Sequence, residues 1–175
     1  MDVFLVTREQ RLRAGAQRAV DKVEAACGGR DEQAMFEALG ECLTWICALD
    51  RFFELRADYR SRRNSDRQGE GQLLLGLRHA RNTILHGDAV VGVAESTDVP
   101  YPQVITNGRG RHSRYVGPPT MVRWTFDQMF LTPTKPAPHL EPVYAAHIAG
   151  SEVSTTIGSA ISWLDRELAT PMTGR

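Results

Sequence analysis

Residues 81–86 read Arg-Asn-Thr-Ile-Leu-His and bring together three side chains that could act on a phosphodiester. Such a reaction needs a group that transfers protons and a cation beside the charge that develops in the transition state. His86 suits the first role and Arg81 the second, while Asn82 could orient the imidazole or a phosphate oxygen through hydrogen bonds. The segment therefore predicts chemistry on a phosphodiester.

These residues fall at the end of a predicted helix that begins near Glu70 or Gly71 and carries leucines at helical spacing. Gly87 stands where a left-handed C-terminal cap belongs, so we expect the helix to end at His86. Arg78, Asn82 and His86 are four residues apart and should share one polar stripe, with Arg81 beside it. A helix C-terminus also favours a protonated imidazole, which suits a general acid.

Three further helices are predicted to surround this one. The first is predicted to begin at a capping box, 7–10, with Asp2 as an earlier alternative start, and to stop at Gly28. The second is capped by Asp31, has a long apolar stripe from 35 to 53, and runs into a charged segment, 60–67, that should be solvated and end in a loop. The last is expected after a Ser151 cap, with a buried face that contains Val153, Ile157, Ala160, Ile161, Leu164 and Leu168.

Residues 88–150 differ from the helical parts, since they hold most of the prolines and several strand-like runs. Strands are predicted at 89–94, 103–106 and 120–126, with a turn or longer loop at Asn107-Gly108 and a loop at 132–142. The predicted fold is one mainly α domain, 1–175, formed by a bundle of four to five helices. A small β-rich, proline-containing insertion, 88–150, separates its third and fourth helices.

The segment Arg81-Asn82-Thr83-Ile84-Leu85-His86 resembles the Arg-x4-6-His motif of HEPN-domain ribonucleases, including the polar residue directly after the arginine. The resemblance covers the first three predicted helices well, the fourth in outline, and the insertion hardly at all. It implies a HEPN-like helical bundle and a metal-independent endoribonuclease that uses no cofactor. The 2′-hydroxyl of RNA would attack the adjacent phosphate and leave a cyclic phosphate end.

The same resemblance assigns roles and partners. Arg81 would stabilise the phosphate, Asn82 would assist, and His86 would act as the acid and base. Two copies of the chain would form a homodimer with both motifs in one cleft. A toxin or phage-defence effector of this kind would act on an RNA substrate and could have a cognate antitoxin protein as partner.

A second basic segment lies within the insertion. Guanidinium groups next to aromatic rings suit single-stranded nucleic acid, because phosphates meet the charges and bases stack on the rings. We expect this segment, with Arg78, to contact RNA, although a solvated loop tip, an antitoxin-binding surface or a dimer edge would give the same composition. Its residues are Arg109, Arg111, His112, Arg114, Tyr115, Arg123 and Trp124.

Other interpretations of the motif stay open. His86 could cap the carbonyls at the helix end, and Arg81 could form an ion pair with an acid such as Glu41 or Asp50. The chain would then be a catalytically inactive HEPN-like interaction module. A third possibility is a nucleic-acid-binding protein without chemistry that acts through the insertion.

Composition limits the remaining classes. With 21 basic and 21 acidic residues the formal net charge is zero, so any nucleic acid must be held by a local patch. Cys27, Cys42 and Cys47 lack metal-ligand spacing and are expected to be small core residues, with no zinc site and no disulfide framework. There is no phosphate-binding loop, no dinucleotide fingerprint and no apolar run of membrane length, which favours a cytosolic protein that does not contact membranes.

Overall fold

The computed structural model describes residues 7–27, 31–56, 58–66, 69–85, 91–95, 103–106, 113–116, 120–124 and 139–169. For Glu32, Leu85, the first three strands, Thr120 and Met121 it describes the backbone alone. As predicted, this part of the chain is mainly α-helical. The helices are α1 (Arg8–Cys27), α2 (Glu32–Phe53), α3 (Tyr59–Ser65), α4 (Glu70–Leu85), α5 (Glu141–His147) and α6 (Val153–Ala169).

The starts of the first two helices follow from local hydrogen bonds. The Thr7 amide donates to Gln10 Oε1 at 2.8 Å and the Gln10 amide donates to Thr7 Oγ1 at 3.2 Å, which is the predicted capping box. The Asp31 carboxylate accepts from the Ala34 amide at 3.0 Å and caps α2 as expected. The last helix begins at Val153, so Glu152 rather than Ser151 directly precedes it.

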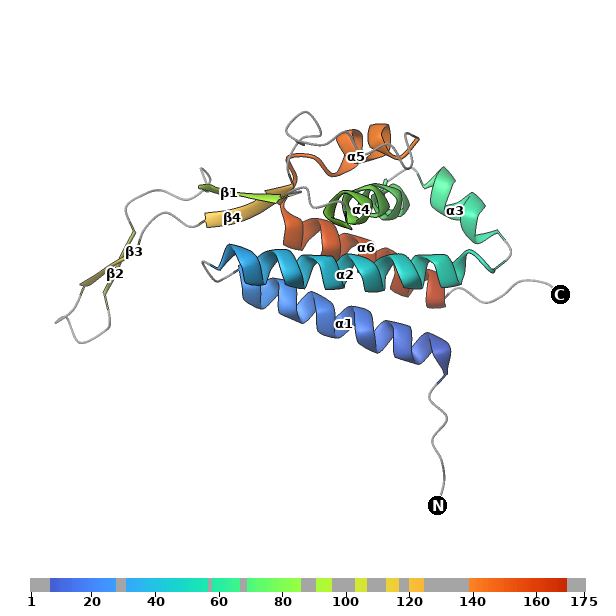
Figure 1. Ribbon diagram of the computed structural model, residues 1–175, viewed down its shortest axis with the longest axis horizontal. Helices are drawn as coiled ribbons and strands as arrows, with labels where there is room; N and C mark the ends of the chain where they lie inside the picture. Colours follow the sequence, from blue (N-terminus) through green and yellow to red (C-terminus); the bar gives the residue numbers. More distant parts are fainter. Residues whose placement is uncertain are drawn as a thin grey trace, which may run out of the picture.

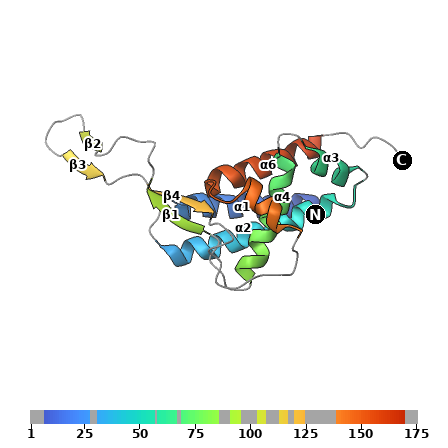
Figure 2. The ribbon, with the colours of Figure 1, turned by 90° about the horizontal axis from the view of Figure 1, so that it is seen from above.

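The long helices α1, α2 and α6 lie roughly along the longest axis of the molecule, and α4 runs across them (Figures 1 and 2). Helix α5 covers the side of α4 that faces away from α1 (Figure 1). One core of buried apolar side chains joins all these helices to the strand β4. The largest fully buried side chains include Trp124, Tyr59, Tyr144 and Phe53.

Two short helices were not predicted. Helix α3 occupies most of the charged segment that was expected to be solvated, and its Arg63 is only 4 % exposed. The segment folds because acids on α2 bind Arg63, a contact between distant positions that local patterning does not reveal. Helix α5 begins at the end of the predicted loop, with Pro142 in the first turn where its missing N–H costs nothing. Its buried Tyr144 and Ile148 fix it on α4, beside Gly76.

Among the described residues between α4 and α5 there are four strands. β1 (Val91–Glu95) pairs antiparallel with β4 (Thr120–Trp124), and β2 (Gln103–Thr106) pairs antiparallel with β3 (Ser113–Val116). β4 alternates as predicted, with Val122 and Trp124 buried and Arg123 between them half-buried. The Trp124 amide donates to the Ser151 carbonyl at 3.0 Å, and the Gly150 amide donates back to the Trp124 carbonyl at 2.9 Å. β4 is therefore attached to the α5–α6 connection, whereas β2 and β3 lie beyond it, away from the helices (Figure 2).

The three cysteines are free thiols on α1 and α2. Cys42 and Cys47 are buried, as expected of core residues, and Cys27 is half-buried. No described helix is both long and apolar enough to cross a membrane. Among the described residues, no cluster of three or more His, Cys, Asp or Glu side chains could hold a metal ion.

Candidate functional site at the end of helix α4

Helix α4 presents the described part of the motif. Arg81 and Asn82 are half-buried neighbours in its last turns, and Thr83 and Ile84 after them are buried. The Thr83 hydroxyl donates to the His79 carbonyl at 3.1 Å, within the helix. His86 and Gly87 lie outside the described residues, and α4 is described to Leu85. The structure thus positions two of the three predicted catalytic residues, Arg81 and Asn82.

Arg78, which was predicted to share a stripe with Asn82 and to contact RNA, has two acidic partners inside the fold. Its Nη2 atom lies 2.5 Å from Asp50 Oδ2 and 2.8 Å from Glu54 Oε1. Asp50 belongs to α2 and Glu54 is the C-cap residue directly after it, and the Arg78 side chain is 24 % exposed. Although burial acts in the opposite direction, the charges of Asp50 and Glu54 raise the pKa of Arg78.

These contacts belong to a larger cluster, which we call the α2 carboxylate cluster and which comprises Asp50, Glu54, Tyr59, Arg63 and Arg78. Arg63 Nη1 donates to both oxygens of Asp50, at 2.9 and 3.1 Å, and to Glu54 Oε1 at 3.0 Å. The Tyr59 hydroxyl donates to Asp50 Oδ1 at 2.6 Å. Asp50 itself is fully buried, so the cluster supplies the partners that a buried charge requires.

The two carboxylates of the cluster meet the guanidinium groups of Arg63 and Arg78, and the exposed Arg60 of α3 lies 3.9 Å from Glu54. Burial raises the pKa of Glu54, but the hydrogen bonds and charges of Arg78 and Arg63 lower it more, so the group is held ionised. Burial and the adjacent Asp50 charge raise the pKa of Tyr59 well above its usual range, which keeps its hydroxyl a donor. Asp50 therefore accepts hydrogen bonds from three directions and has little capacity for another partner.

Sequence reasoning missed this cluster, although one signal was available. Asp50 lies between Leu49 and Phe53 in the apolar stripe of α2, where a charge needs a partner. The sequence offered Arg81 as a possible partner of Asp50 or Glu41. In the structure Asp50 instead pairs with Arg63 and Arg78, and Glu41 pairs with Lys22 at 2.6 Å.

Arg81 lies one turn further along α4 than Arg78. Burial raises the pKa of the Cys47 thiol to about 12, with Asp50 adding to the rise and the charges of Arg81 and Arg78 opposing it. Within the described part of the chain, the side chains of Arg81 and Asn82 make no hydrogen bond and no ion pair. A guanidinium group that is half-buried and has no carboxylate beside it can accept an anion, which it would bind through several donors.

The second basic segment is divided by the structure. Arg109, Arg111 and His112 lie outside the described residues, and Arg114 and Tyr115 belong to β3, of which the backbone alone is described. Arg123 lies on β4, in the other strand pair, and its Nη1 atom donates to the Gly150 carbonyl at 2.9 Å. Trp124 is 1 % exposed and is thus a core residue instead of an exposed ring for base stacking. The structure accordingly does not bring Arg123 into one sheet with Arg114 and Tyr115.

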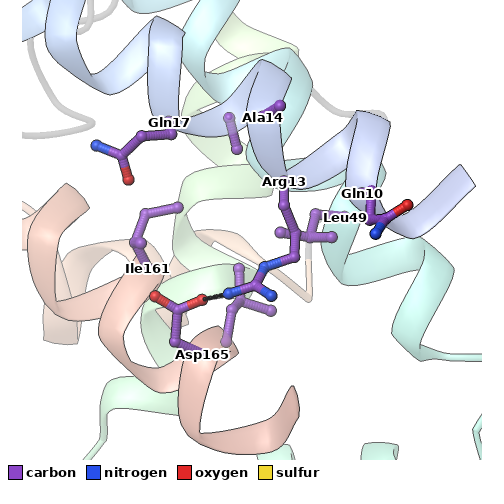
Figure 3. A pocket seen from close by; sticks show the side chains of 9 residues that line it. Gln10, Arg13, Ala14, Gln17, Leu49, Ile161 and Asp165 are labelled. Atoms are coloured by element: carbon purple, nitrogen blue, oxygen red, sulfur yellow. Dashed lines mark hydrogen bonds and ion pairs between the residues drawn. The ribbon is translucent and has the colours of Figure 1, made fainter. Parts of the chain in front are cut away.

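A hollow of about 380 Å³ opens elsewhere, between α1 and α6 (Figure 3). Its floor includes Leu49 and Leu164, and Arg13 of α1 lies 2.9 Å from Asp165 of α6 at its rim. None of the described residues of α4 lines it. None of the residues that line it is a buried charged or nucleophilic group.

Comparisons of the chain with protein-family models, curated proteins and solved structures found no match.

Proposed function

We propose that the chain is a HEPN-type, metal-independent endoribonuclease and that Arg81, Asn82 and His86 form its active site. One observation carries this proposal: Arg81 is half-buried and unpaired among the described residues, directly before Asn82 and five positions before His86. Phosphodiester cleavage without a metal needs three kinds of group, and this segment contains a residue for each. A cation faces the phosphate, a polar group assists it, and an imidazole transfers protons.

The reaction itself is a transfer within the RNA chain. The 2′-oxygen attacks the adjacent phosphorus as it loses its proton to a base, and the bond from phosphorus to the 5′-oxygen breaks. The leaving oxygen takes up a proton, so the products are a 2′,3′-cyclic phosphate and a 5′-hydroxyl end. In this scheme Arg81 neutralises the charge on the non-bridging oxygens. His86 supplies a proton-transfer group, and a homodimer would provide a second imidazole in the same cleft.

The unpaired state of Arg81 supports this assignment over a structural one. An arginine that serves only to hold two helices together would be expected to have a carboxylate partner, as Arg78 and Arg63 have. Asp50 and Glu41, the two acids that the sequence offered as ion-pair partners of Arg81, are paired with other residues. The charge of Arg81 is therefore available for a ligand, and a phosphodiester of RNA is the ligand that the neighbouring residues suit.

The test uses purified protein and a fluorescent oligoribonucleotide, in buffer containing EDTA. Wild type should cleave it and leave cyclic phosphate ends, and a 2′-deoxy substitution at the cleaved position should block the reaction. Arg81→Ala and His86→Ala should each lower the rate by at least about 100-fold, as expected for the loss of a charge-stabilising or proton-transfer group. Arg18→Ala, an exposed arginine on α1, is the matched control and should cleave as wild type does.

Induced expression of the same variants extends the test to cells. Growth arrest with RNA cleavage, abolished by Arg81→Ala and His86→Ala at equal protein levels, is the expected result. Cleavage that survives either substitution would contradict the proposed site. The absence of cleavage by folded, dimeric wild type would contradict the proposed activity.

A second candidate is a catalytically inactive helical interaction module, and the contacts of Arg78 favour it. That side chain belongs to the same stripe as Asn82 and yet serves the internal packing of α4 against α2. If the whole stripe has this role, His86→Ala should lower the melting temperature by several degrees, for a loss of about 1 kcal/mol in the free energy of unfolding. A variant with an unchanged melting temperature and lost cleavage would exclude this candidate.

A further inference from the structure

Two arginines on α4, one helical turn apart, differ in their partners. Arg78 binds Asp50 and Glu54, whereas Arg81 has no partner among the described residues. Arg78 faces α2 through these ion pairs, and Arg81 follows it on α4 by three residues, about one helical turn. The two arginines therefore differ in whether Asp50 and Glu54 bind them.

The contacts between α2 and α4 run in opposite order along the two helices. A Cβ at Gly40 would lie 3.6 Å from Ile84, while Asp50 and Glu54, later in the chain, bind Arg78, which precedes Ile84. Arg81 lies between Ile84 and Arg78 on α4, one turn from the arginine that binds Asp50. One turn rises about 5.4 Å, a distance that a flexible arginine side chain can span. Asp50 is thus the acid that Arg81 would reach if Arg78 did not hold it.

We propose that Arg78 is a positioning residue that occupies Asp50 and Glu54 and thereby keeps Arg81 free to bind the RNA phosphate. This inference rests on the proposed function for its consequence, although the competition for Asp50 can be measured without RNA. It assigns Arg78 a role through Arg81, where the sequence predicted direct contact with RNA. Tyr59 and Arg63 assist, since they fill the remaining acceptor positions of Asp50.

Replacing Arg78, which competes with Arg81 for Asp50, should let the Arg81 side chain turn toward Asp50. In Arg78→Gln, one cation leaves the α2 carboxylate cluster. Asp50 then keeps Arg63, and Glu54 keeps Arg63 and the exposed Arg60. Arg81 then turns toward Asp50. If that pair is as strong as a typical charge-assisted hydrogen bond, the population with a free Arg81 falls about 10- to 100-fold, and RNA cleavage falls by the same factor. Adding Asp50→Asn removes the attracting charge and should free Arg81 again.

The experiment measures the arginine side chains directly. The Arg81 Nε–H signal in ¹⁵N-arginine NMR spectra, assigned by its loss in Arg81→Lys, should show a mobile group in wild type. It should become rigid and slow to exchange in Arg78→Gln and mobile again in Arg78→Gln with Asp50→Asn. Cleavage of an oligoribonucleotide should fall and recover in the same order. The double variant is compared with Asp50→Asn alone, which it should match within about threefold.

Three outcomes would overturn the inference. A mobile Arg81 in Arg78→Gln would show that no competition exists. Cleavage lost in Arg78→Gln and not recovered with Asp50→Asn, with Arg81 mobile throughout, would mean that Arg78 contacts RNA itself. Arg78→Lys keeps the charge and tests the inference even if the glutamine variant does not fold. It should retain cleavage within about threefold, and a loss as large as that of Arg81→Ala would contradict the positioning role.

Failure of the proposed function gives a different pattern. If wild type does not cleave RNA, the cleavage arm is silent in every variant, but the NMR arm still reports whether Arg81 moves to Asp50. The two proposals can therefore fail separately.

Discussion

Replacing Asp50 by Ala should be among the most destabilising single changes in the described helices. The carboxylate is fully buried and accepts from Tyr59, Arg63 and Arg78. Its removal leaves the guanidinium group of Arg63, whose side chain is 5 % exposed, without one of its two acids. Breaking a buried ion pair in this way costs about 3 to 5 kcal/mol, because an uncompensated charge stays in the interior. At about 2 to 4 °C per kcal/mol for a domain of this size, the melting temperature should fall by roughly 6 to 20 °C.

A matched control separates burial from charge pairing as such. Asp165 also pairs with an arginine of another helix, at the same distance of 2.9 Å, but its side chain is 53 % exposed and that of Arg13 is 48 % exposed. Asp165→Ala should cost at most about 1 kcal/mol, since water screens an exposed pair. Urea unfolding followed by circular dichroism gives both values. Equal losses in Asp50→Ala and Asp165→Ala would refute the view that the α2 carboxylate cluster stabilises α2, α3 and α4 through buried pairing.

Three other perturbations follow from the contacts. Gly76→Ala should destabilise the fold by about 1 to 3 kcal/mol, because the new Cβ would lie 2.6 Å from Ile148. At Gly158 a new Cβ would have no atom within 4 Å, so Gly158→Ala should stabilise the fold by up to ~1 kcal/mol. Urea unfolding measures both changes. Native protein should be alkylated first at the half-buried Cys27, since burial raises the pKa of the Cys42 and Cys47 thiols to about 12. Mass spectrometry measures the order of labelling, and simultaneous labelling of all three cysteines would contradict the packing. The folded pKa of Glu54 lies below its unfolded value of about 4.3, so its contribution is fully present above that pH and is lost as pH falls through the folded value. Glu54→Gln should accordingly flatten the loss of stability below about pH 4.3, and an unchanged pH profile would count against this assignment.

The fold was predictable where local interactions decide it. The capping box at Thr7 and the Asp31 cap each involve residues three positions apart, so the starts of α1 and α2 follow from the sequence. Helices α3 and α5 are only seven residues long, and isolated helices of that length are not stable. They form because Arg63 binds acids on α2 and because Tyr144 and Ile148 bury against α4. Those partners are distant in sequence, and helical periodicity carries no information about them.

The site was predictable to the same extent. Residue type and helical spacing identify Arg78, Arg81 and Asn82 as neighbours on one helix, and the structure places all three at half-buried positions of α4. Spacing along α4 cannot distinguish an arginine that pairs with α2 from one that stays free, because the acids belong to another helix. Asp50 and Glu54 decide between Arg78 and Arg81, and that decision required the packing of α2 on α4.

A net charge of zero is compatible with an anion site when the local count of charges is unequal. Asp50 near the end of α2 and Glu54 directly after it offer two carboxylates, and arginines of α3 and α4 lie around them. Arg63 and Arg78 neutralise these acids, the exposed Arg60 also lies 3.9 Å from Glu54, and Arg81 remains on α4 as a further positive charge beside Asn82. Such an excess requires Arg63 and Arg78 to stay in place, since the loss of either would leave an acid able to capture Arg81. The α2 carboxylate cluster therefore links the stability of the fold to the availability of the proposed phosphate-binding residue, and variants that disturb the cluster should change both.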